Sequence, residues 1–93
     1  MFVVVAYDIP DNKRRTKVMK VLQGYGMHVQ ESVFECDLQA PTYQQLRQRL
    51  HKLINLDQDN VRFYHLCQAD VPRIECVGVG RAVQVMTELK IIS

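Results

Sequence analysis

The chain opens on an almost unbroken apolar run. Residues 2–8, FVVVAYD, are β-branched or aromatic except for Ala6 and the terminal Asp8. Such a run predicts a β-strand that is apolar on both of its faces. A strand of this kind needs cover above and below its sheet.

Two helices are predicted by apolar positions spaced three and four residues apart. The first follows a turn at residues 10–12, which supplies a candidate N-cap, and ends near Gly24. The second opens at Pro41 and ends near Asn55. Each helix has one apolar stripe for the sheet. The stripes comprise Val18, Val21, Leu22 and Tyr25 in the first helix and Tyr43, Leu46, Leu50, Leu53 and Ile54 in the second.

The remaining apolar segments are predicted to be extended. Residues 27–38 alternate without a clean face, so they form either one bent strand or two short strands with a corner near Glu31. Residues 60–67 and 74–79 are two further predicted strands, separated by a short turn. Residues 82–93 fit either a helical turn with an edge strand or a mostly extended segment.

This order of elements describes a small sandwich with one sheet and two helices on a single face. Two helices cannot cover both sides of the sheet, although the strand at residues 2–8 is apolar on both sides. A twofold homodimer with its bare sheet faces opposed is the simplest solution.

The composition is that of an ordinary globular chain, with 47% hydrophobic and 24% charged residues. Three cysteines without C-x-x-C spacing predict neither a disulfide framework nor a zinc site, and we interpret them as reduced residues packed in strands. No stretch approaches the roughly 20 apolar residues of a membrane span. We therefore expect a cytoplasmic protein with no membrane partner and a single domain over residues 1–93.

The net charge of +2 is too small to indicate a nucleic-acid partner, but the basic residues are clustered. Three lie in the second helix, and five of the twelve lie in one eight-residue window of the first. A lysine-rich helix face suits a nucleic-acid backbone without base reading, and an ordinary solvated face is the alternative. The candidate nucleic-acid-binding residues are Lys13, Arg14, Arg15, Lys17 and Lys20.

Asp8 is the first candidate for chemistry. It stands at the carboxyl end of its strand, where ligands collect in α/β units, and helical spacing directs Arg14 and Arg15 toward it. Cations in a first helical turn oppose the helix macrodipole, which marks the place as unusual. A carboxylate beside arginines is suited to holding Mg²⁺ against a phosphodiester. The alternative is a structural Asp8 that caps the helix or pairs with one of these arginines.

Several motifs, in order, resemble the small CRISPR-associated endonuclease family of spacer acquisition, the second core Cas protein. They cover nearly the whole chain: a strand ending in Y-D-I, then K-R-R-x-K-V, Y-G, V-Q-x-S-V-F-E, QDNVRFYHL and VGVG. The resemblance implies an α+β fold, a ferredoxin-like βαββαβ sandwich with an extra C-terminal edge strand, and a homodimer packed through its sheets. It favours two short strands within residues 27–38, and it implies that residues from about 80 to 93 pair with the partner subunit.

The resemblance also implies the chemistry of the site. It makes Asp8 the ligand of a divalent metal, Mg²⁺ or another such as Mn²⁺, between the two subunits. The family's functional positions near this acid match Tyr7, Arg15, Ser32 and Phe34. Together with the spacing argument, the candidate catalytic residues are Tyr7, Asp8, Arg14, Arg15, Ser32 and Phe34. Lys17 and His28 occupy places where some relatives carry Arg.

Two functions follow from these features. The first is a Mg²⁺-dependent endonuclease acting on RNA or DNA in CRISPR adaptation, with the two copies of Asp8 sharing one ion across a twofold axis. The second is a non-catalytic dimeric scaffold that positions DNA and docks the larger CRISPR integrase, with its C-terminal edge strand available for β-augmentation. A ferredoxin-like small-molecule sensor is a third class.

Overall fold

The computed structural model describes residues 1–78, so the predictions made for residues 79–93 lie outside the described part of the chain. The elements follow in the order β1 (Phe2–Asp8), α1 (Asn12–Gln23), β2 (Met27–Gln30), β3 (Val33–Asp37), α2 (Ala40–Leu53), β4 (Asn60–Leu66) and the 3₁₀ helix η1 (Gln68–Arg73).

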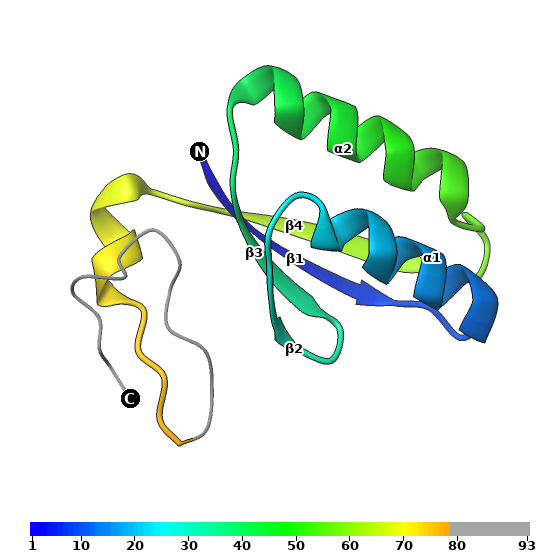
Figure 1. Cartoon of the computed structure of the whole chain (residues 1–93), viewed down its shortest axis with the longest axis horizontal. Helices are drawn as coiled ribbons and strands as arrows, with labels where there is room; N and C mark the ends of the chain where they lie inside the picture. Colours follow the sequence, from blue (N-terminus) through cyan, green and yellow to red (C-terminus); the bar gives the residue numbers. More distant parts are fainter. Residues whose placement is uncertain (79–93) are drawn as a thin grey trace.

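The four strands form one sheet in the order β2-β3-β1-β4, and every neighbouring pair is antiparallel. Both α-helices lie over the same face of this sheet (Figure 1). The order and direction of the elements are those of a ferredoxin-like βαββαβ sandwich, which confirms the predicted α+β class. β1 is a central strand that ends beside the start of α1.

Alternate residues of β1 enter two different cores. Val3, Val5 and Tyr7 belong to the main core, beneath the helices, with Phe34 and Cys36 of β3. The helices contribute Val18, Leu22, Tyr43, Leu46 and Leu50 to the same core. Period-2 alternation of side chains therefore explains why the whole of β1 is apolar.

The opposite face of the sheet, called the open face below, is covered at one end. There Phe2 packs on Val71 of η1, with Val4, Leu66 and Ile74 around them. Farther along the face, Tyr64 remains 48% exposed. The predicted need for a second cover is therefore met in part by η1 within residues 1–78.

Glu35 lies on the open face, because it pairs in register with Val4. Its Oε1 atom is buried and has no hydrogen-bond partner in the described part of the chain. This burial raises the pKa of the Glu35 carboxyl. A buried acceptor without a donor is costly, so Glu35 marks a place where a hydrogen-bond donor from a further group would stabilise the structure.

The two-strand interpretation of residues 27–38 is confirmed, with β2 and β3 separated by a tight turn. The register shifts between His28 and Gln30, where β2 carries a bulge. A bulge adds one residue to a strand and reverses the alternation of side chains beyond it. This extra residue explains why the segment shows no clean apolar face in the sequence.

The predicted strand at residues 74–79 is wrong for the residues that are described. Residues 68–73 form η1 in place of a short turn, and Ile74–Val77 are in no strand. Pro72 lacks the N–H that a strand pairing uses, and the chain bends so that Val71 covers Phe2. The second helix also ends at Leu53, two residues before the predicted Asn55, because Ile54 is extended.

The cysteines differ from one another. Cys36 is buried in β3, as predicted, and burial raises the pKa of its thiol to about 11. Cys36 therefore packs as a small apolar side chain. Cys67 is exposed just after β4, and Cys76 lies outside the strands, so the prediction of strand positions is wrong for these two.

Within residues 1–78, neither helix combines the length and the apolar character that crossing a bilayer requires.

Gly26 is expected to be essential to the packing of β2 on β3. A Cβ atom there would lie 2.4 Å from Cys36 Sγ and 2.5 Å from the Glu35 carbonyl oxygen. We expect Gly26→Ala to lower the free energy of unfolding by about 1–3 kcal/mol, as overpacking does. Urea or thermal unfolding measures the change.

Gly24→Ala is the matched control for this prediction. Gly24 has ordinary helical backbone angles, and the nearest atom to an added Cβ is the Val21 carbonyl oxygen at 3.4 Å. We expect this change to be neutral or stabilising by up to about 1 kcal/mol, because alanine restricts the unfolded chain. If Gly24→Ala and Gly26→Ala lowered the free energy of unfolding equally, the role of Gly26 would be contradicted.

Candidate active site

Asp8 ends β1 with an exposed side chain, opposite Asn60 of β4. The N-cap of α1 is Asp11, whose carboxylate accepts a hydrogen bond from the Arg14 N–H at 2.9 Å. Arg14 pairs with Asp11 and Asp59. Among residues 1–78, Asp8 thus neither caps the helix nor pairs with either neighbouring arginine, and its carboxylate faces solvent.

The alternation of β1 places the Asp8 carboxylate on the open face. Tyr7 belongs to the main core, whereas Val4 packs on the opposite side of the sheet. Successive side chains of a strand point to opposite faces, so Asp8 shares the side of Val4 and Ala6. The Tyr7 hydroxyl is therefore on the other side of the sheet from this carboxylate.

Tyr7, Ser32 and Phe34 lie together behind Asp8. The Tyr7 N–H donates to the Ser32 carbonyl at 3.1 Å, and its hydroxyl donates to the Glu31 carbonyl at 3.2 Å. The rings of Tyr7 and Phe34 are stacked with their centroids 6.4 Å apart. These residues attach the β2–β3 turn to the end of β1.

The Tyr7 phenol stays protonated at neutral pH. Burial is the main cause that raises its pKa, and the charge of Glu31 adds to this effect. The positive charge of Arg15 is the second-largest influence on this pKa and lowers it, but burial outweighs it. Tyr7 is therefore a hydrogen-bond donor at this site.

His28 is a neighbour of this group that the spacing of residues did not indicate. Its ring stacks on Phe34 with centroids 4.4 Å apart and an interplanar angle of 2°. Its Nε2 lies 3.0 Å from the Glu31 carbonyl, which can only accept, so Nε2 carries the proton. The sequence singled out His28 only through the family resemblance, as a position where some relatives carry Arg.

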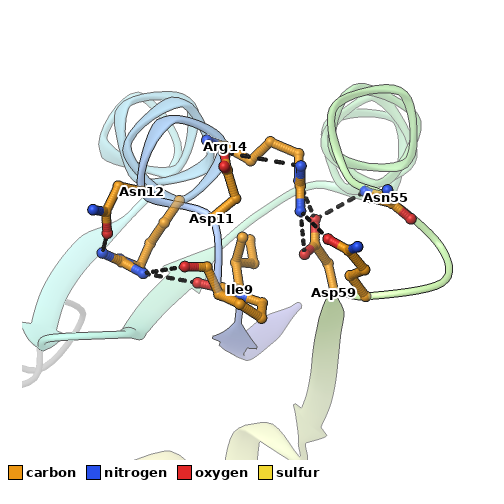
Figure 2. A network of polar contacts seen from close by, with 9 residues as sticks. Ile9, Asp11, Asn12, Arg14, Asn55 and Asp59 are labelled. Carbon is orange, nitrogen blue, oxygen red and sulfur yellow. Dashed lines mark hydrogen bonds and ion pairs between the residues drawn. The ribbon is translucent and has the colours of Figure 1, made fainter.

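Arg15 curls back onto the loop that follows Asp8. Its Nη1 donates to the Ile9 carbonyl at 2.8 Å and weakly to the Pro10 carbonyl at 3.4 Å (Figure 2). Its other terminal nitrogen donates to Asn12 Oδ1. The predicted direction of Arg15 toward the end of β1 agrees with these contacts. Its charge lies beside the loop that Asp8 opens.

Arg14 turns instead toward the α2–β4 loop, as Figure 2 shows. Its Nε donates to Asp59 Oδ2 at 2.8 Å, and its Nη2 donates to Asp59 Oδ1 at 3.1 Å. A third bond reaches Gln58 Oε1 at 3.0 Å. The expectation that Arg14 points at Asp8 is therefore wrong. The buried carboxylate of Asp59 accepts two hydrogen bonds from the planar Arg14 guanidinium and directs this side chain away from Asp8.

Asp59 is the partner of Arg14, and nothing in the sequence indicated this pair. Its side chain has 0% exposure, and its Oδ2 also accepts from the Asn55 N–H at 2.9 Å. The hydrogen bond from Arg14 is the largest cause that lowers the pKa of Asp59. The two residues are 45 positions apart, so no local spacing links them.

One described chain supplies only part of a metal site. Residues 1–78 contain no cluster of three or more His, Cys, Asp or Glu side chains able to hold a metal. The Asp8 carboxylate is nevertheless the hard oxygen donor that Mg²⁺ prefers, and Mg²⁺ is commonly held by one or two carboxylates with waters and phosphate oxygens. Asp8 therefore fits as one ligand, and a second chain or a bound phosphate would have to complete the set.

The fold and the site define a ferredoxin-like α+β protein with one exposed acid at the end of its first strand. The family model described as CRISPR associated protein Cas2 matches residues 1–74. The chain belongs to the Cas2 family, which confirms the resemblance in its motifs.

Three relatives illustrate the match. The CRISPR-associated endoribonuclease Cas2 1 of Chloroflexus aurantiacus is 45% identical over 99% of this chain and all of its own length. The crystal structure of Streptococcus pyogenes Cas2 is 35% identical with a TM-score of 0.76, covering 84% of this chain and 100% of that one. A chain of a partial Cas6-RT-Cas1–Cas2 complex is 29% identical with a TM-score of 0.71, covering 82% and 89%.

The Arg14–Asp59 pair is expected to make stability depend on pH. Because the pKa of Asp59 is lowered in the folded chain, the stability from this pair is present above the unfolded-state value, near 4, and is lost as pH falls through the folded-state value. We expect Arg14→Gln to lower the melting temperature at pH 7 and to lose this effect at acidic pH. Circular dichroism melts between about pH 2.5 and 7 would measure both.

Arg73→Gln is the control for this experiment. It removes the same charge from an ion pair with Asp70 whose two side chains are 81% and 54% exposed. Exposed pairs contribute little, so the melting temperature should barely change. If Arg14→Gln lowered the melting temperature by the same amount across the whole pH range, the ionic role of Asp59 would be contradicted.

Proposed function

We propose that this chain is a metal-dependent endonuclease of CRISPR adaptation that hydrolyses RNA or DNA phosphodiesters at Asp8, with Mg²⁺ or a similar divalent ion such as Mn²⁺. The observation that carries this proposal is the exposed Asp8 carboxylate, which makes no cap and no ion pair among the described residues. The name of the Chloroflexus relative, an endoribonuclease, supports the nuclease class.

The active form in this proposal is a homodimer that joins two open faces. Asp8 shares that face with Glu35, whose buried oxygen lacks a donor, and with the exposed Tyr64 ring. A second copy laid on this face would cover the Tyr64 ring and would have to supply Glu35 with a hydrogen-bond donor. Twofold symmetry would also bring the two Asp8 carboxylates toward each other, so that each chain would supply one metal ligand.

The residues around Asp8 have separate tasks in this mechanism. When bound, the divalent ion supplies Lewis-acid polarisation of the phosphodiester and a water of lowered pKa. The Asp8 carboxylate holds the ion, and the Arg15 guanidinium places positive charge beside the loop, where negative charge develops. Tyr7 and Phe34 fix the strand end by packing, and the protonated phenol of Tyr7 does not serve as a general base.

A second candidate function is a non-catalytic scaffold, favoured by the structural neighbour from a Cas1–Cas2 complex. In this role the dimer would dock the larger integrase and position DNA, and Asp8 would not be required. The two functions can coexist in one protein, and they differ in their dependence on Asp8.

Asp8→Asn is expected to lower metal-dependent cleavage at least about 100-fold, because loss of a ligand should cost no less than loss of a residue that only orients one. Cleavage of labelled single-stranded RNA and duplex DNA across a Mg²⁺ series measures this. Asp57→Asn removes the same charge from an exposed loop and should keep full activity. Equal cleavage by Asp8→Asn and wild type would refute a site at Asp8, and cleavage by none of the three would favour the scaffold.

The homodimer is tested by Tyr64→Glu, which puts a charge on the open face next to Val4. Burying an unpaired carboxylate is costly, so we expect the dimer dissociation constant to rise at least about tenfold in sedimentation experiments. Gln48→Glu makes a similar change on the exposed side of α2 and should leave the dimer intact. A Tyr64→Glu protein that dimerises as wild type would rule out pairing through this face.

A further inference from the structure

Two strands meet at the edge of the sheet where Asp8 lies. Asp8 is the last residue of β1, and Asn60, the first residue of β4, pairs directly with it in the antiparallel ladder. Both residues are exposed. Val61 and Phe63 pack against the main core, so the alternation of side chains along β4 turns Asn60 to the open face. Asp8 and Asn60 are therefore cross-strand neighbours on the same face of the sheet.

The spacing of such neighbours suits two ligands of one metal ion. Directly opposite Cβ atoms of antiparallel strands are about 4.5–5.5 Å apart. An octahedral ion such as Mg²⁺ holds its ligand oxygens at about 2.0–2.1 Å, so two adjacent ligand oxygens are about 3 Å apart. The Asp8 carboxylate and the Asn60 amide each extend beyond Cβ by one carbon and one oxygen. A small lean of each side chain toward the other brings the two oxygens to that separation.

Asn60 has a donor atom of the kind that a second ligand needs. Amide carbonyl oxygens are hard ligands for divalent cations, as carboxylate oxygens are. The absence of a cluster of His, Cys, Asp or Glu side chains within residues 1–78 therefore does not bear on asparagine. The polar contacts of the loop before β4 are made by Asn55, Gln58 and Asp59. Within the described chain the Asn60 amide bonds to no other residue, which leaves its oxygen available to a ligand.

The first turn of α1 holds the backbone beside both members of this pair. Arg15 donates to the carbonyl of the residue that follows Asp8. Arg14 donates to both carboxylate oxygens of Asp59, the residue that precedes Asn60 (Figure 2). Neighbouring arginines thus fix the two strand ends from which Asp8 and Asn60 project. Side chains on supported strand ends are placed in advance for binding, as a metal site requires.

The charges around the pair favour a bound cation. The cation on the same stretch of β4 is Arg62, which lies opposite Ala6 and is therefore a diagonal neighbour of Asp8, about 7–8 Å away. Its Nη1 donates to the Tyr64 hydroxyl at 3.3 Å, and it forms no ion pair among residues 1–78. The Asp8 charge is thus left uncompensated by direct contact. A neutral amide adds an oxygen ligand beside it without the repulsion that a second carboxylate would bring.

We propose that Asn60 is a second metal-binding residue, which supplies its amide oxygen to the divalent ion held by the Asp8 carboxylate. This role rests on the proposed metal site at Asp8 and deepens it. One chain then contributes two neighbouring ligands of an octahedral set, and a second chain, water and phosphate oxygens complete the set. The ion joins the end of β1 to the start of β4, two strand ends that the arginines of α1 already hold.

Binding of Mn²⁺ to the full chain without nucleic acid tests Asn60 separately from cleavage, and electron paramagnetic resonance measures the free ion. We expect Asn60→Leu, which keeps the size of the side chain and removes its oxygen, to raise the Kd for Mn²⁺ at least about tenfold. Asn60→Asp should lower this Kd at least about tenfold, because a charged ligand replaces a neutral one. Thermal melts and sedimentation should show both variants folded and assembled as wild type, because Asn60 is exposed.

Arg62→Met is the matched control for charge. It changes the charge of the open face by the same amount as Asn60→Asp, two residues along β4, and adds no oxygen beside Asp8. Salt screens an interaction over this diagonal distance, so the Kd for Mn²⁺ should change less than about threefold at physiological ionic strength. Equal tightening by Arg62→Met and Asn60→Asp would reduce the effect to local charge and overturn the role of Asn60.

Asp8→Asn separates a failure of this proposal from a failure of the proposed function. Mn²⁺ binding that is lost in Asp8→Asn and unchanged in Asn60→Leu would keep the metal at Asp8 and overturn only the role of Asn60. Unchanged Mn²⁺ binding in Asp8→Asn would place the ion elsewhere and overturn both. If wild type bound no Mn²⁺ up to about 1 mM, the two-residue site would be overturned, and cleavage by Asp8→Asn would still decide the proposed function.

Discussion

The arrangement of this protein depends on the burial of β1 from both sides. β1 pairs with β3 along one edge and β4 along the other, so its side chains can leave the sheet only above and below. Val3, Val5 and Tyr7 fill the core under the helices, and Phe2 and Val4 require cover on the opposite face. The 3₁₀ helix η1 covers only part of that face, and Tyr64 stays exposed on the rest. The same alternation that makes the strand apolar also sets Asp8 on the open face, next to where a second chain would lie.

The basic start of α1 is compatible with folding because two acids compensate it. Cations in a first helical turn oppose the macrodipole by about 0.3–1 kcal/mol each. Asp11 caps the helix, and the carboxylate of Asp59 accepts two hydrogen bonds from Arg14. Arg15 bonds to the carbonyls of the preceding loop. The neighbouring arginines thus have different surroundings: Arg14 joins α1 to the α2–β4 loop, and Arg15 bonds to the loop that follows Asp8.

The sequence predicted those parts of the fold that follow from local periodicity. β1 was predicted with its observed bounds, and the stripes of both helices lie in or against the main core, because a period of 2 or 3.6 reports burial directly. The bulge in β2 and the turn of η1 were not predictable, since each depends on which distant residue needs cover or pairing. Val71 bends toward Phe2 across 69 positions of the chain, and no local pattern records that contact.

Contacts between residues distant in the sequence also limited what could be predicted of the site. The position of Asp8 at a strand end followed from the pattern of β1, and the direction of Arg14 did not, because its partner is 45 residues away. Asp59 also explains why Arg14 should not be grouped with the lysines of α1. A guanidinium already bonded to a carboxylate has little free charge for phosphate, whereas the lysines on the outer side of the helix have no such partner among residues 1–78. The two faces of the molecule therefore differ in charge: the sheet presents the exposed Asp8 carboxylate, and the outer side of α1 presents exposed lysines that make no ion pair among residues 1–78.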